Sequence, residues 1–460
     1  MGWRMPSRLP MIIILPCRPF VPSHTKSDFL ERRRFPMGDS VFALTQQGEV
    51  TRDGFINQAA RVAAQLPHEG SVLNVSSDRF DFALGLVAAW MAKIPTLLPS
   101  DQGRGQVAEL SRTYPLLHHL GDAEIQAYRL QGRDQKHLFD GFDQNLDQPV
   151  VIPFTSGTTG DPVPHPKTLS SLKGSAALIN RQLGGAKGIR MVATVPPQHM
   201  YGLELTLLLP LFEEAILDWR RPFFPGDILS ALQEGPTPVS LVTTPLHLRA
   251  LLSLADENLP KVSFIVSATA PLPLELAREA EARFAAPLHE VYGCTELGSI
   301  AGRRPVDSEV WRWYSGVECM PEADGHQVRA AHVISPARVS DQLEILTDTT
   351  FLLKGRNADL VNIAGKRASI RALERAALAI QGVRDVAFVQ GDEAEGNVGR
   401  LSALVVLDPS VSLATVKSAL RRDLDPAFVP RTLIQVPSLP RNAVGKLPRS
   451  KLLAFLAEVS

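Results

Sequence analysis

A run of small hydroxyl residues and glycines, Phe154-Thr-Ser-Gly-Thr-Thr-Gly160, directly follows a short apolar segment at residues 150–152. Glycines let backbone N–H groups approach a phosphate chain closely, and Ser and Thr hydroxyls add further hydrogen-bond donors. No Gly-Lys-Ser/Thr follows at the spacing of a Walker loop, so the run is not a loop of that type. Taken alone, it is compatible with a phosphate-binding loop or with a polar turn between a strand and a helix.

Three further segments follow in a fixed order along the chain. They are Val291-Tyr-Gly-Cys-Thr-Glu296, then Gly355-Arg356 followed by Asp359, Gly365 and Arg367, and finally Pro440-Arg-Asn-Ala-Val-Gly-Lys446. Together with the hydroxyl-rich run, these segments resemble the motifs of the adenylate-forming superfamily of acyl-CoA synthetases, adenylation domains and luciferases. The resemblance covers about residues 40–455, which is nearly the whole chain.

The resemblance implies an ATP-dependent ligase that forms an acyl- or aryl-adenylate, releases pyrophosphate and passes the acyl group to a pantetheine thiol. The implied chemistry is physically reasonable. A carboxylate with a pKa near ~4 is already ionised at neutral pH, so its attack on the α-phosphorus of ATP needs no general base. The remaining obstacle is repulsion between the carboxylate and the polyphosphate, which charge neutralisation and alignment must overcome. ATP and Mg²⁺ are therefore the expected cofactors.

By the same resemblance, the hydroxyl-rich run contacts the phosphates of ATP. Its expected ligands are Thr155, Ser156, Gly157, Thr158, Thr159 and Gly160. Thr295 is expected to contact the α-phosphate, and Glu296 to ligate Mg²⁺, a cation that prefers oxygen ligands. Lys446 is expected to reach the carboxylate and the α-phosphate oxygens as a movable point charge. We predict Thr295, Glu296 and Lys446 as catalytic residues, together with His199.

The resemblance also implies residues for the nucleoside. Tyr292 is expected near adenine, with Ala268 in the turn Ser267-Ala-Thr-Ala270 offering backbone contacts. Asp341 and Arg356, fifteen residues apart, match the ribose-binding pair of the superfamily. Asp348 is the alternative to Asp341, because no Thr-Gly precedes Asp341 as it does in most relatives. Gly293 and Arg367 complete the predicted ATP-binding set.

The acyl and thiol substrates are expected beside His199 and Gly365. The segment Gln198-His-Met-Tyr-Gly202 follows an apolar run, at a place where relatives often have a His or an aromatic residue beside the acyl pocket. His199 is expected to gate this pocket or to help a thiol lose its proton, with a hydrogen-bonded structural role as the alternative. Gly365 is expected to border the pantetheine tunnel.

The sequence departs from its relatives at two motifs. Val163 stands where relatives have the Lys of Gly-x-Pro-Lys, and Lys167 follows four residues later, where it is expected to supply the missing charge to ATP. Ala358 stands at the usual hinge position, which in relatives is Asp or Lys. The compact length and the Pro-His-Pro-Lys variant resemble the small ligases of aryl-polyene-type pigment and lipid clusters.

This narrower resemblance favours an acyl carrier protein as the acceptor of the acyl group. Free coenzyme A is the alternative within the same enzyme class, because both acceptors present a pantetheine arm. A catalytically silent nucleotide-binding scaffold is the alternative from another class, against which Thr295, Glu296 and Lys446 argue.

Short apolar runs alternate with helical segments from residue 71 onward, which is typical of helix-covered, mainly parallel sheets. After about residue 356 the pattern changes to a compact α+β unit of about a hundred residues. The sequence therefore predicts an α/β protein with a large N-terminal domain at residues 37–356, which binds ATP and the acid. A small, mobile C-terminal lid is predicted at residues 357–460. Residues 1–36 lack periodicity and are predicted to be a disordered extension.

Bulk composition excludes several classes of partner. Lys plus Arg and Asp plus Glu are both 48, so the chain has no net charge that would attract nucleic acid, and none is expected as a partner. No apolar run reaches the ~18 residues that suggest a membrane span. The three cysteines, Cys17, Cys294 and Cys319, have no metal-ligand spacing, and a disulfide framework is not expected. A cytoplasmic location is therefore predicted.

Overall fold

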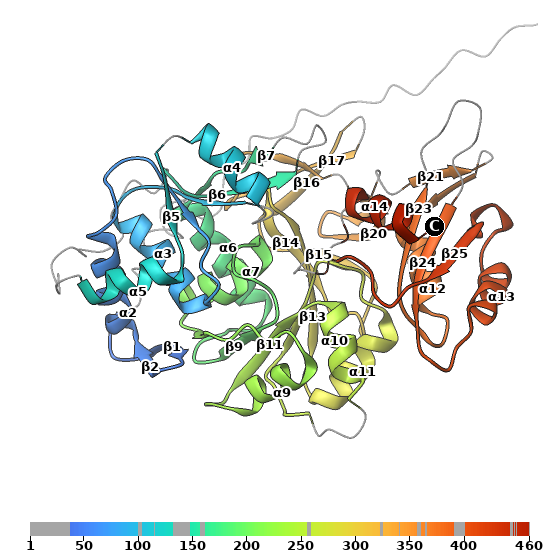
Figure 1. Ribbon diagram of the computed structural model, residues 1–460, viewed down its shortest axis with the longest axis horizontal. Coiled ribbons are helices and arrows are strands. Elements are labelled where there is room, and N and C mark those ends of the chain that lie inside the picture. The colour runs from blue at the N-terminus through green and yellow to red at the C-terminus, as the bar shows by residue number, and fades with distance from the viewer. Residues whose placement is uncertain are drawn as a thin grey trace, which may run out of the picture. The chain divides into compact units, whose positions relative to one another are not determined.

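The computed structural model describes most of the 460-residue chain. The described residues are 37–99, 104–114, 116–131, 148–156, 162–254, 259–322, 325–339, 341–356, 360–363, 366–390, 401–441, 445, 447 and 449–459. The predicted disordered extension at residues 1–36 lies outside this part. Helices combined with sheets confirm the predicted α/β class (Figure 1), but the described strands pair in parallel only at the centre of the large sheet, in most of the second sheet and once in the C-terminal sheet. The predicted boundary between the large domain and the lid at residues 356 and 357 stays a prediction.

The largest sheet has eleven strands in the order β19-β20-β15-β14-β13-β12-β11-β9-β10-β1-β2. The neighbouring pairs from β13 to β1 are parallel, and the pairs at both ends are antiparallel. The strands are β1 (Val41–Thr45), β2 (Gly48–Thr51), β9 (Arg190–Ala193), β10 (Ile216–Asp218), β11 (Val239–Thr243), β12 (Ile265–Ser267), β13 (Leu288–Cys294), β14 (Gly298–Arg303), β15 (Trp311–Trp313), β19 (Asp341–Thr347) and β20 (Thr350–Arg356).

The central parallel strands are buried on both faces. Successive residues of a strand point to opposite faces, and Leu241 and Val242 of β11 belong to two different hydrophobic clusters. Val192 and Met191 of β9 divide between the same two clusters. This double burial explains why the strands read as continuous apolar runs in the sequence.

A second sheet is formed by the part of the chain between β2 and β9 of the large sheet. Its order is β5-β3-β4-β6-β7, and β8 also pairs with β6. The pairs among β5, β3, β4 and β6 are parallel, whereas β7 and β8 run antiparallel to β6. The strands are β3 (Ser71–Asn74), β4 (Thr96–Leu98), β5 (Leu117–Leu120), β6 (Pro149–Ser156), β7 (Pro162–Pro164) and β8 (Lys167–Thr168). A small antiparallel sheet contains β16 (Val317–Glu322), β17 (Gly325–Ala330) and β18 (Ala337–Val339).

Helices follow most of these strands, and side-chain caps fix where several of them begin. Asp78 accepts hydrogen bonds from the N–H groups of Phe80 and Asp81, which starts α3. No helix in the described ranges has the length and apolar character needed to cross a membrane. The helices are α2 (Arg52–Ala63), α3 (Arg79–Met91), α4 (Arg104–Thr113), α5 (Asp122–Gln131), α6 (Leu169–Gln182), α7 (Met200–Leu203), the π-helix η1 (Glu204–Leu208), α8 (Leu209–Glu213), α9 (Pro225–Gln233), α10 (Pro245–Leu252) and α11 (Leu274–Phe284).

The C-terminal part contains its own sheet and its own core. The hairpin β21 (Leu360–Ile363) and β22 (Lys366–Ser369) precedes a three-stranded sheet of β23 (Val383–Gln390), β24 (Leu401–Leu407) and β25 (Thr432–Gln435). The helices are α12 (Ile370–Leu378), α13 (Leu413–Asp423) and α14 (Arg449–Val459), with a 3-10 turn, η3 (Pro426–Phe428). Phe388, Val405 and Leu420 belong to one buried cluster of this part. The order of elements agrees with the α+β unit predicted from the sequence.

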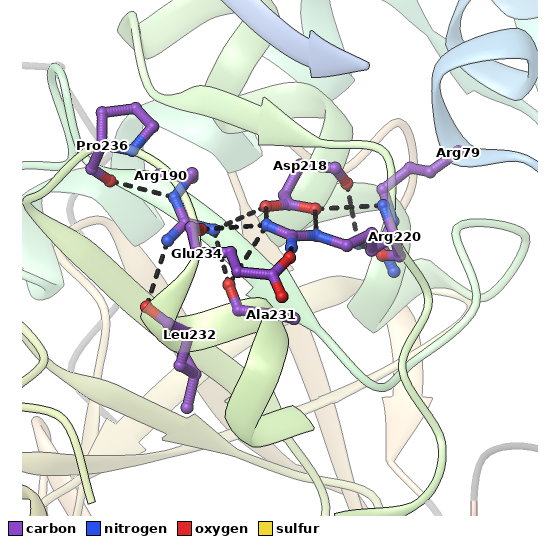
Figure 2. A network of polar contacts seen from close by, with 8 residues as sticks. All are labelled: Arg79, Arg190, Asp218, Arg220, Ala231, Leu232, Glu234 and Pro236. Atoms are coloured by element: carbon purple, nitrogen blue, oxygen red, sulfur yellow. Dashed lines mark hydrogen bonds and ion pairs between the residues drawn. The ribbon is translucent and has the colours of Figure 1, made fainter. Parts of the chain in front are cut away.

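A buried charge network holds β9 and β10 to α9 (Figure 2). Arg190 donates from Nη1 to Asp218 Oδ2 at 2.6 Å, and both side chains are fully buried. Arg220 donates to the same carboxylate oxygen at 2.8 Å. The Arg190 guanidinium also donates to three backbone carbonyl oxygens, those of Ala231, Leu232 and Pro236. Because these acceptors come from different elements, the network fixes how the strands and the helix meet.

Arg79, the first residue of α3, links the two sheets. It donates to the carbonyl oxygens of Ala193 and Val195, at 3.0 and 2.9 Å, where the chain leaves β9. It also donates to the carbonyl oxygens of Asp218 and Arg220, as Figure 2 shows. Burial lowers the pKa of Arg79 to about 10, although the Asp218 carboxylate opposes this, so the side chain is charged at neutral pH. Arg79 therefore fixes the carboxyl end of β9.

We predict that Asp218→Asn lowers the free energy of unfolding by about 3 kcal/mol, because it leaves Arg190 buried without a compensating charge. Glu234→Gln is the matched control. Its carboxylate pairs with Arg220 at 3.0 Å, but its side chain is 69% exposed, so the loss should stay below about 0.5 kcal/mol. Urea unfolding at neutral pH measures both values. Equal losses in the two variants would contradict a structural role for the buried pair.

Candidate functional site

The carboxyl ends of four neighbouring parallel strands bring the predicted site residues to one edge of the large sheet. In the register, Thr243 of β11 is opposite Ser267 of β12, and Ser267 is opposite Glu290 of β13. The chain leaves these strands toward Thr244, Ala268 and the 295–297 turn. Ligands of open α/β sheets bind in the crevice outside the carboxyl ends of the strands. This edge is therefore the candidate active site.

Thr295, Glu296 and Leu297 form the turn of a tight β-hairpin between β13 and β14. Gly298 follows with φ +72°, a conformation that favours glycine. Gly293 pairs with Ser299, and a Cβ added at Gly293 would lie 2.2 Å from the carbonyl oxygen of Gly298. The glycines therefore let the hairpin close directly behind its turn, which presents Thr295 and Glu296 at the edge of the sheet.

The Glu296 carboxylate is 36% exposed and lies beside a histidine that the sequence motifs did not identify. His165 Nε2 is 3.7 Å from Glu296 Oε1 and 2.8 Å from Thr155 Oγ1. Burial alone would raise the pKa of the Glu296 carboxyl. Hydrogen bonds from its own backbone N–H and from the Cys294 thiol, with the charges of His165 and Lys167, outweigh burial and lower that pKa. Glu296 is therefore ionised at neutral pH.

Lys167 lies beneath the turn that carries Glu296. Its side chain is buried, and its Nζ donates to the backbone carbonyl oxygen of Glu296 at 2.5 Å. Burial lowers the pKa of Lys167, while the negative charges of Glu204 and Glu296 oppose this effect. The sequence motifs predicted that Lys167 contacts ATP. The structure directs its ammonium group to the backbone of the turn, and a direct contact with ATP stays a prediction.

Glu204, in the π-helix η1, is a second buried ionisable residue at this turn, and the sequence motifs gave no indication of it. Its carboxylate accepts hydrogen bonds from the Ser299 N–H at 3.0 Å and from the Ser299 hydroxyl at 2.5 Å. The Ser175 hydroxyl also donates to it. Burial raises the pKa of Glu204, and these hydrogen bonds together with Lys167 oppose the shift. A single π-helical turn inside an α-helix often marks a functional site.

The predicted ribose-binding pair comes together in the structure. Asp341 and Arg356 are directly opposite each other in the antiparallel pair β19–β20. The Tyr292 hydroxyl lies 2.9 Å from Asp341 Oδ2, a hydrogen bond that fixes the carboxylate. Asp348, the alternative, is exposed in the hairpin turn at the far end of these strands. This geometry favours Asp341.

Tyr292 is packed in an aromatic group with Trp311, Trp313 and Phe351. The ring centroids of Tyr292 and Trp311 are 5.8 Å apart, and those of Trp313 and Phe351 are stacked at 4.1 Å. All four side chains are buried. This packing holds the Tyr292 ring, while Trp311 and Trp313 contribute to the core.

Two further predicted residues lie at the same edge. Ala268 is buried just after β12, and Thr269 beside it has φ +78°, an unusual conformation for a residue other than glycine. His199 follows β9 and is the N-cap residue of α7. Tyr201, two residues later, places its hydroxyl 3.0 and 2.9 Å from the carbonyl oxygens of Thr243 and Val266. This contact holds α7, and His199 with it, over the ends of β11 and β12.

For the remaining predicted residues, the structure gives the backbone position only or does not describe them. Thr155 and Ser156 end β6, but Gly157, Thr158, Thr159, Gly160, Ala358, Gly365 and Lys446 lie outside the described residues. The backbone of Arg367 lies in β22. Gly445, next to Lys446, has φ +74°, and an added Cβ would lie 3.7 Å from the Thr244 hydroxyl. The segment before Lys446 therefore lies beside the carboxyl end of β11.

No group of three or more His, Cys, Asp or Glu side chains that could hold a metal ion occurs within the described ranges. The two cysteines in these ranges, Cys294 and Cys319, are free. Burial raises the pKa of the Cys294 thiol to about 12. The thiol is thus protonated at neutral pH, and Glu296 is the carboxylate of the turn that is available to a cation.

Comparison with known proteins agrees with this geometry. Residues 71–321 match the family model described as AMP-binding enzyme, and residues 372–446 match that of the AMP-binding enzyme C-terminal domain. The chain is similar to the 4-coumarate–CoA ligase of Halorhodospira halophila, with 30% identity over 308 residues, which cover 64% of this chain and 73% of that protein.

Two further likenesses cover more of the chain. The medium/long-chain-fatty-acid–[acyl-carrier-protein] ligase of Mycobacterium tuberculosis is 25% identical over 485 residues, covering 91% of this chain and 86% of that protein. The O-succinylbenzoate coenzyme A synthetase of Bacillus subtilis, solved in complex with ATP and magnesium ion, has a TM-score of 0.73 at 16% identity. It covers 93% of this chain and 98% of that chain, and it shares the fold.

We predict that Tyr292→Phe raises the KM for ATP about fivefold, because Asp341 loses the hydrogen bond that holds it for the ribose. Tyr314→Phe is the matched control. The Tyr314 hydroxyl is buried and has no hydrogen-bond partner in the part of the chain that the structure describes, so its removal should leave this KM unchanged. Steady-state kinetics with ATP as the varied substrate measures both. An equal rise in the two variants would argue against a specific role for the Tyr292–Asp341 contact.

Proposed function

Because this chain belongs to the AMP-binding enzyme family, we propose that the turn at Thr295 and Glu296 is where it joins a carboxylic acid to the α-phosphate of ATP. The chain is an AMP-forming acid–thiol ligase. Its reaction converts an acid, ATP and a thiol into a thioester, AMP and pyrophosphate. The observation that carries the placement is the Glu296 carboxylate, which a lowered pKa keeps ionised at the edge of the parallel sheet.

Glu296 is suited to hold Mg²⁺. This cation is usually bound in proteins by one or two carboxylates together with phosphate oxygens and water. The Glu296 carboxylate is ionised and 36% exposed. His165 Nε2 lies between this carboxylate and the Thr155 hydroxyl, so that a second oxygen ligand is close by. The relative from Bacillus subtilis was solved with ATP and magnesium ion, which supports the same pairing here. When bound, Mg²⁺ offsets the negative charge on the phosphate oxygens.

The residues of the chain itself then align the two anionic substrates. Residues 155–160 wrap the terminal phosphates with backbone N–H groups and hydroxyls. Thr295 donates to the α-phosphate beside Glu296. Lys446 brings a positive charge to the carboxylate and the α-phosphate, where the negative charges of acid and nucleotide meet. In support, the preceding Gly445 lies beside Thr244, at the same edge of the sheet as the turn.

The nucleoside is proposed to lie between the turn after β12 and the β19–β20 pair. Asp341 accepts from the ribose hydroxyls, and Tyr292 fixes the carboxylate through the hydrogen bond already described. Arg356, opposite Asp341 in the register, contributes a second ribose contact. Ala268 and Gly293 offer backbone close to adenine, and Arg367 completes the set.

The acceptor is proposed to be the pantetheine thiol of an acyl carrier protein, with Gly365 beside the pantetheine and His199 beside the acyl group. The relative from Mycobacterium tuberculosis supports this choice, because its similarity extends over 91% of this chain. Coenzyme A is the second candidate, supported by the relative from Halorhodospira halophila. A cytoplasmic location remains part of the proposal.

We predict that Glu296→Gln lowers the rate of acid-dependent pyrophosphate exchange at least about 100-fold, while ATP affinity falls much less. The carboxylate acts where charge develops in the transition state, so it contributes more to the rate than to binding. Exchange of labelled pyrophosphate into ATP, with aryl, short-chain and long-chain acids, measures adenylate formation directly. The absence of exchange by the wild-type protein with every acid would favour the scaffold alternative. Equal losses of rate and affinity would reduce Glu296 to a binding residue.

We also predict that variants at Lys446 and Gly365 separate the two half-reactions. Lys446→Ala should block adenylate formation but still transfer an acyl group from chemically supplied acyl-AMP, because its charge is needed only for the first step. Gly365→Leu should form acyl-AMP and fail to transfer it, because a side chain would obstruct the incoming thiol. Pyrophosphate release and thioester formation are measured separately. Loss of both half-reactions in folded Lys446→Ala would exclude a lid that serves one step at a time.

A further inference from the structure

A buried polar cluster supports the turn at Glu296 from behind, and nothing in the proposed reaction uses it. Its members are Lys167, Ser175, Glu204, Ser299 and His332. All five side chains are buried. None of these residues is accessible to a substrate the size of ATP, so the cluster acts on the reaction through the turn.

The cluster holds both sides of the turn through its backbone. On one side, Lys167 Nζ donates to the carbonyl oxygen of Glu296 at 2.5 Å. On the other side, Glu204 accepts from the N–H and the hydroxyl of Ser299. His332 Nε2 lies 3.2 Å from the carbonyl oxygen of Leu297, between these two points. Three backbone positions of the turn and the strand after it, those of Glu296, Leu297 and Ser299, are thus tied to the interior.

Steric fit makes the position of Glu204 specific. A Cβ added at Gly298 would lie 2.6 Å from Glu204 Oε1, so the carboxylate fits against the bare backbone of the hairpin. The π-helical turn that begins at Glu204 interrupts the regular helix between α7 and α8. The insertion of one extra residue in a helical turn changes which side chain faces the hairpin. The π-helical turn therefore helps to direct the Glu204 carboxylate toward the hairpin.

Stability does not explain why two charged groups are buried here. Lys167 and Glu204 both lose hydration, and replacing such a pair by apolar side chains of similar size is often neutral or stabilising. Buried charged pairs do, in attested cases, specify one arrangement among several. The arrangement specified here is that of the backbone that carries Glu296.

We propose that Lys167 and Glu204 are positioning residues that hold the Glu296 turn in the geometry needed for Mg²⁺-bound ATP. Lys167 fixes the carbonyl of Glu296, and Glu204 fixes the start of β14 at Ser299. Each residue counteracts the pKa shift that burial causes in the other, so each lowers the free-energy cost of burying its partner. This inference rests on the proposed function, in which Glu296 contacts the metal.

The test compares the Kd for ATP with and without Mg²⁺ by isothermal titration calorimetry, in the absence of acid so that no reaction occurs. The ratio of these two Kd values reports how well the turn engages the metal. Lys167→Met and Glu204→Gln should each reduce this ratio about tenfold, the size expected for the loss of a charge-assisted hydrogen bond. Lys187→Met is the matched control, because Lys187 pairs with Glu214 at 2.8 Å on the surface, with its side chain 75% exposed. It should leave the ratio unchanged.

Combination with Glu296→Gln identifies the route of the effect. If Lys167 acts through Glu296, adding Lys167→Met to Glu296→Gln causes no further reduction of the ratio. If Lys167→Met instead weakens ATP binding equally with and without Mg²⁺, Lys167 contacts the phosphates itself and the proposal is overturned. A ratio that stays at the wild-type value, with only the melting temperature lowered, also overturns it. If Glu296→Gln alone leaves the ratio unchanged, the proposed function fails rather than this inference.

A milder variant covers the case in which a buried charge change prevents folding. Ser299→Ala removes one hydrogen bond to Glu204 and leaves both charges and the backbone N–H bond in place. It should reduce the ratio by a smaller factor, about threefold. A folded Ser299→Ala protein with the wild-type ratio would count against Glu204 as a positioning residue.

Discussion

The parallel pairing of β9, β11, β12 and β13 is the constraint on which the site depends. Hydrogen bonds hold these strands in register, so they end at one edge and the segments after them start side by side. The pairing requires helices on both faces, and the apolar residues of the strands supply the buried surface for them. Residues separated by more than 90 positions in the sequence, such as His199 and Glu296, reach the same edge of the sheet for this reason.

The network around Arg190 and the cluster of Lys167 and Glu204 perform different tasks. Arg190 is surrounded by carbonyl oxygens and the Asp218 carboxylate, and it joins β9, β10 and α9 (Figure 2). Lys167 and Glu204 instead contact the backbone of one short turn. The first network decides how strands and helix are packed, and the second decides where a single functional carboxylate is held. Both sets of side chains lose hydration on burial, and each is compensated by its own hydrogen bonds.

Much of the fold was predictable because its signals are local. Apolar runs in the sequence indicated β6, β9 and β11. The pairing of Asp341 with Arg356 was also within reach, since the two residues face each other in a single hairpin. Glu204 was not predictable in this way. Its partner Ser299 is 95 positions away, and a glutamate within the apolar run at residues 203–212 carries no local sign of what it binds.

Lys167 shows how a correct motif can suggest an incomplete role. The motif has Val163 in place of the usual lysine, and from spacing alone the later Lys167 was predicted to contact the phosphates of ATP. The strand β8, however, pairs with β6 so that Lys167 is opposite Val151, in the interior of the protein. From there its ammonium group reaches the carbonyl oxygen of Glu296. The ammonium group is therefore held beneath the turn, at the edge proposed to bind ATP, where water and salt screen its charge less than at the surface.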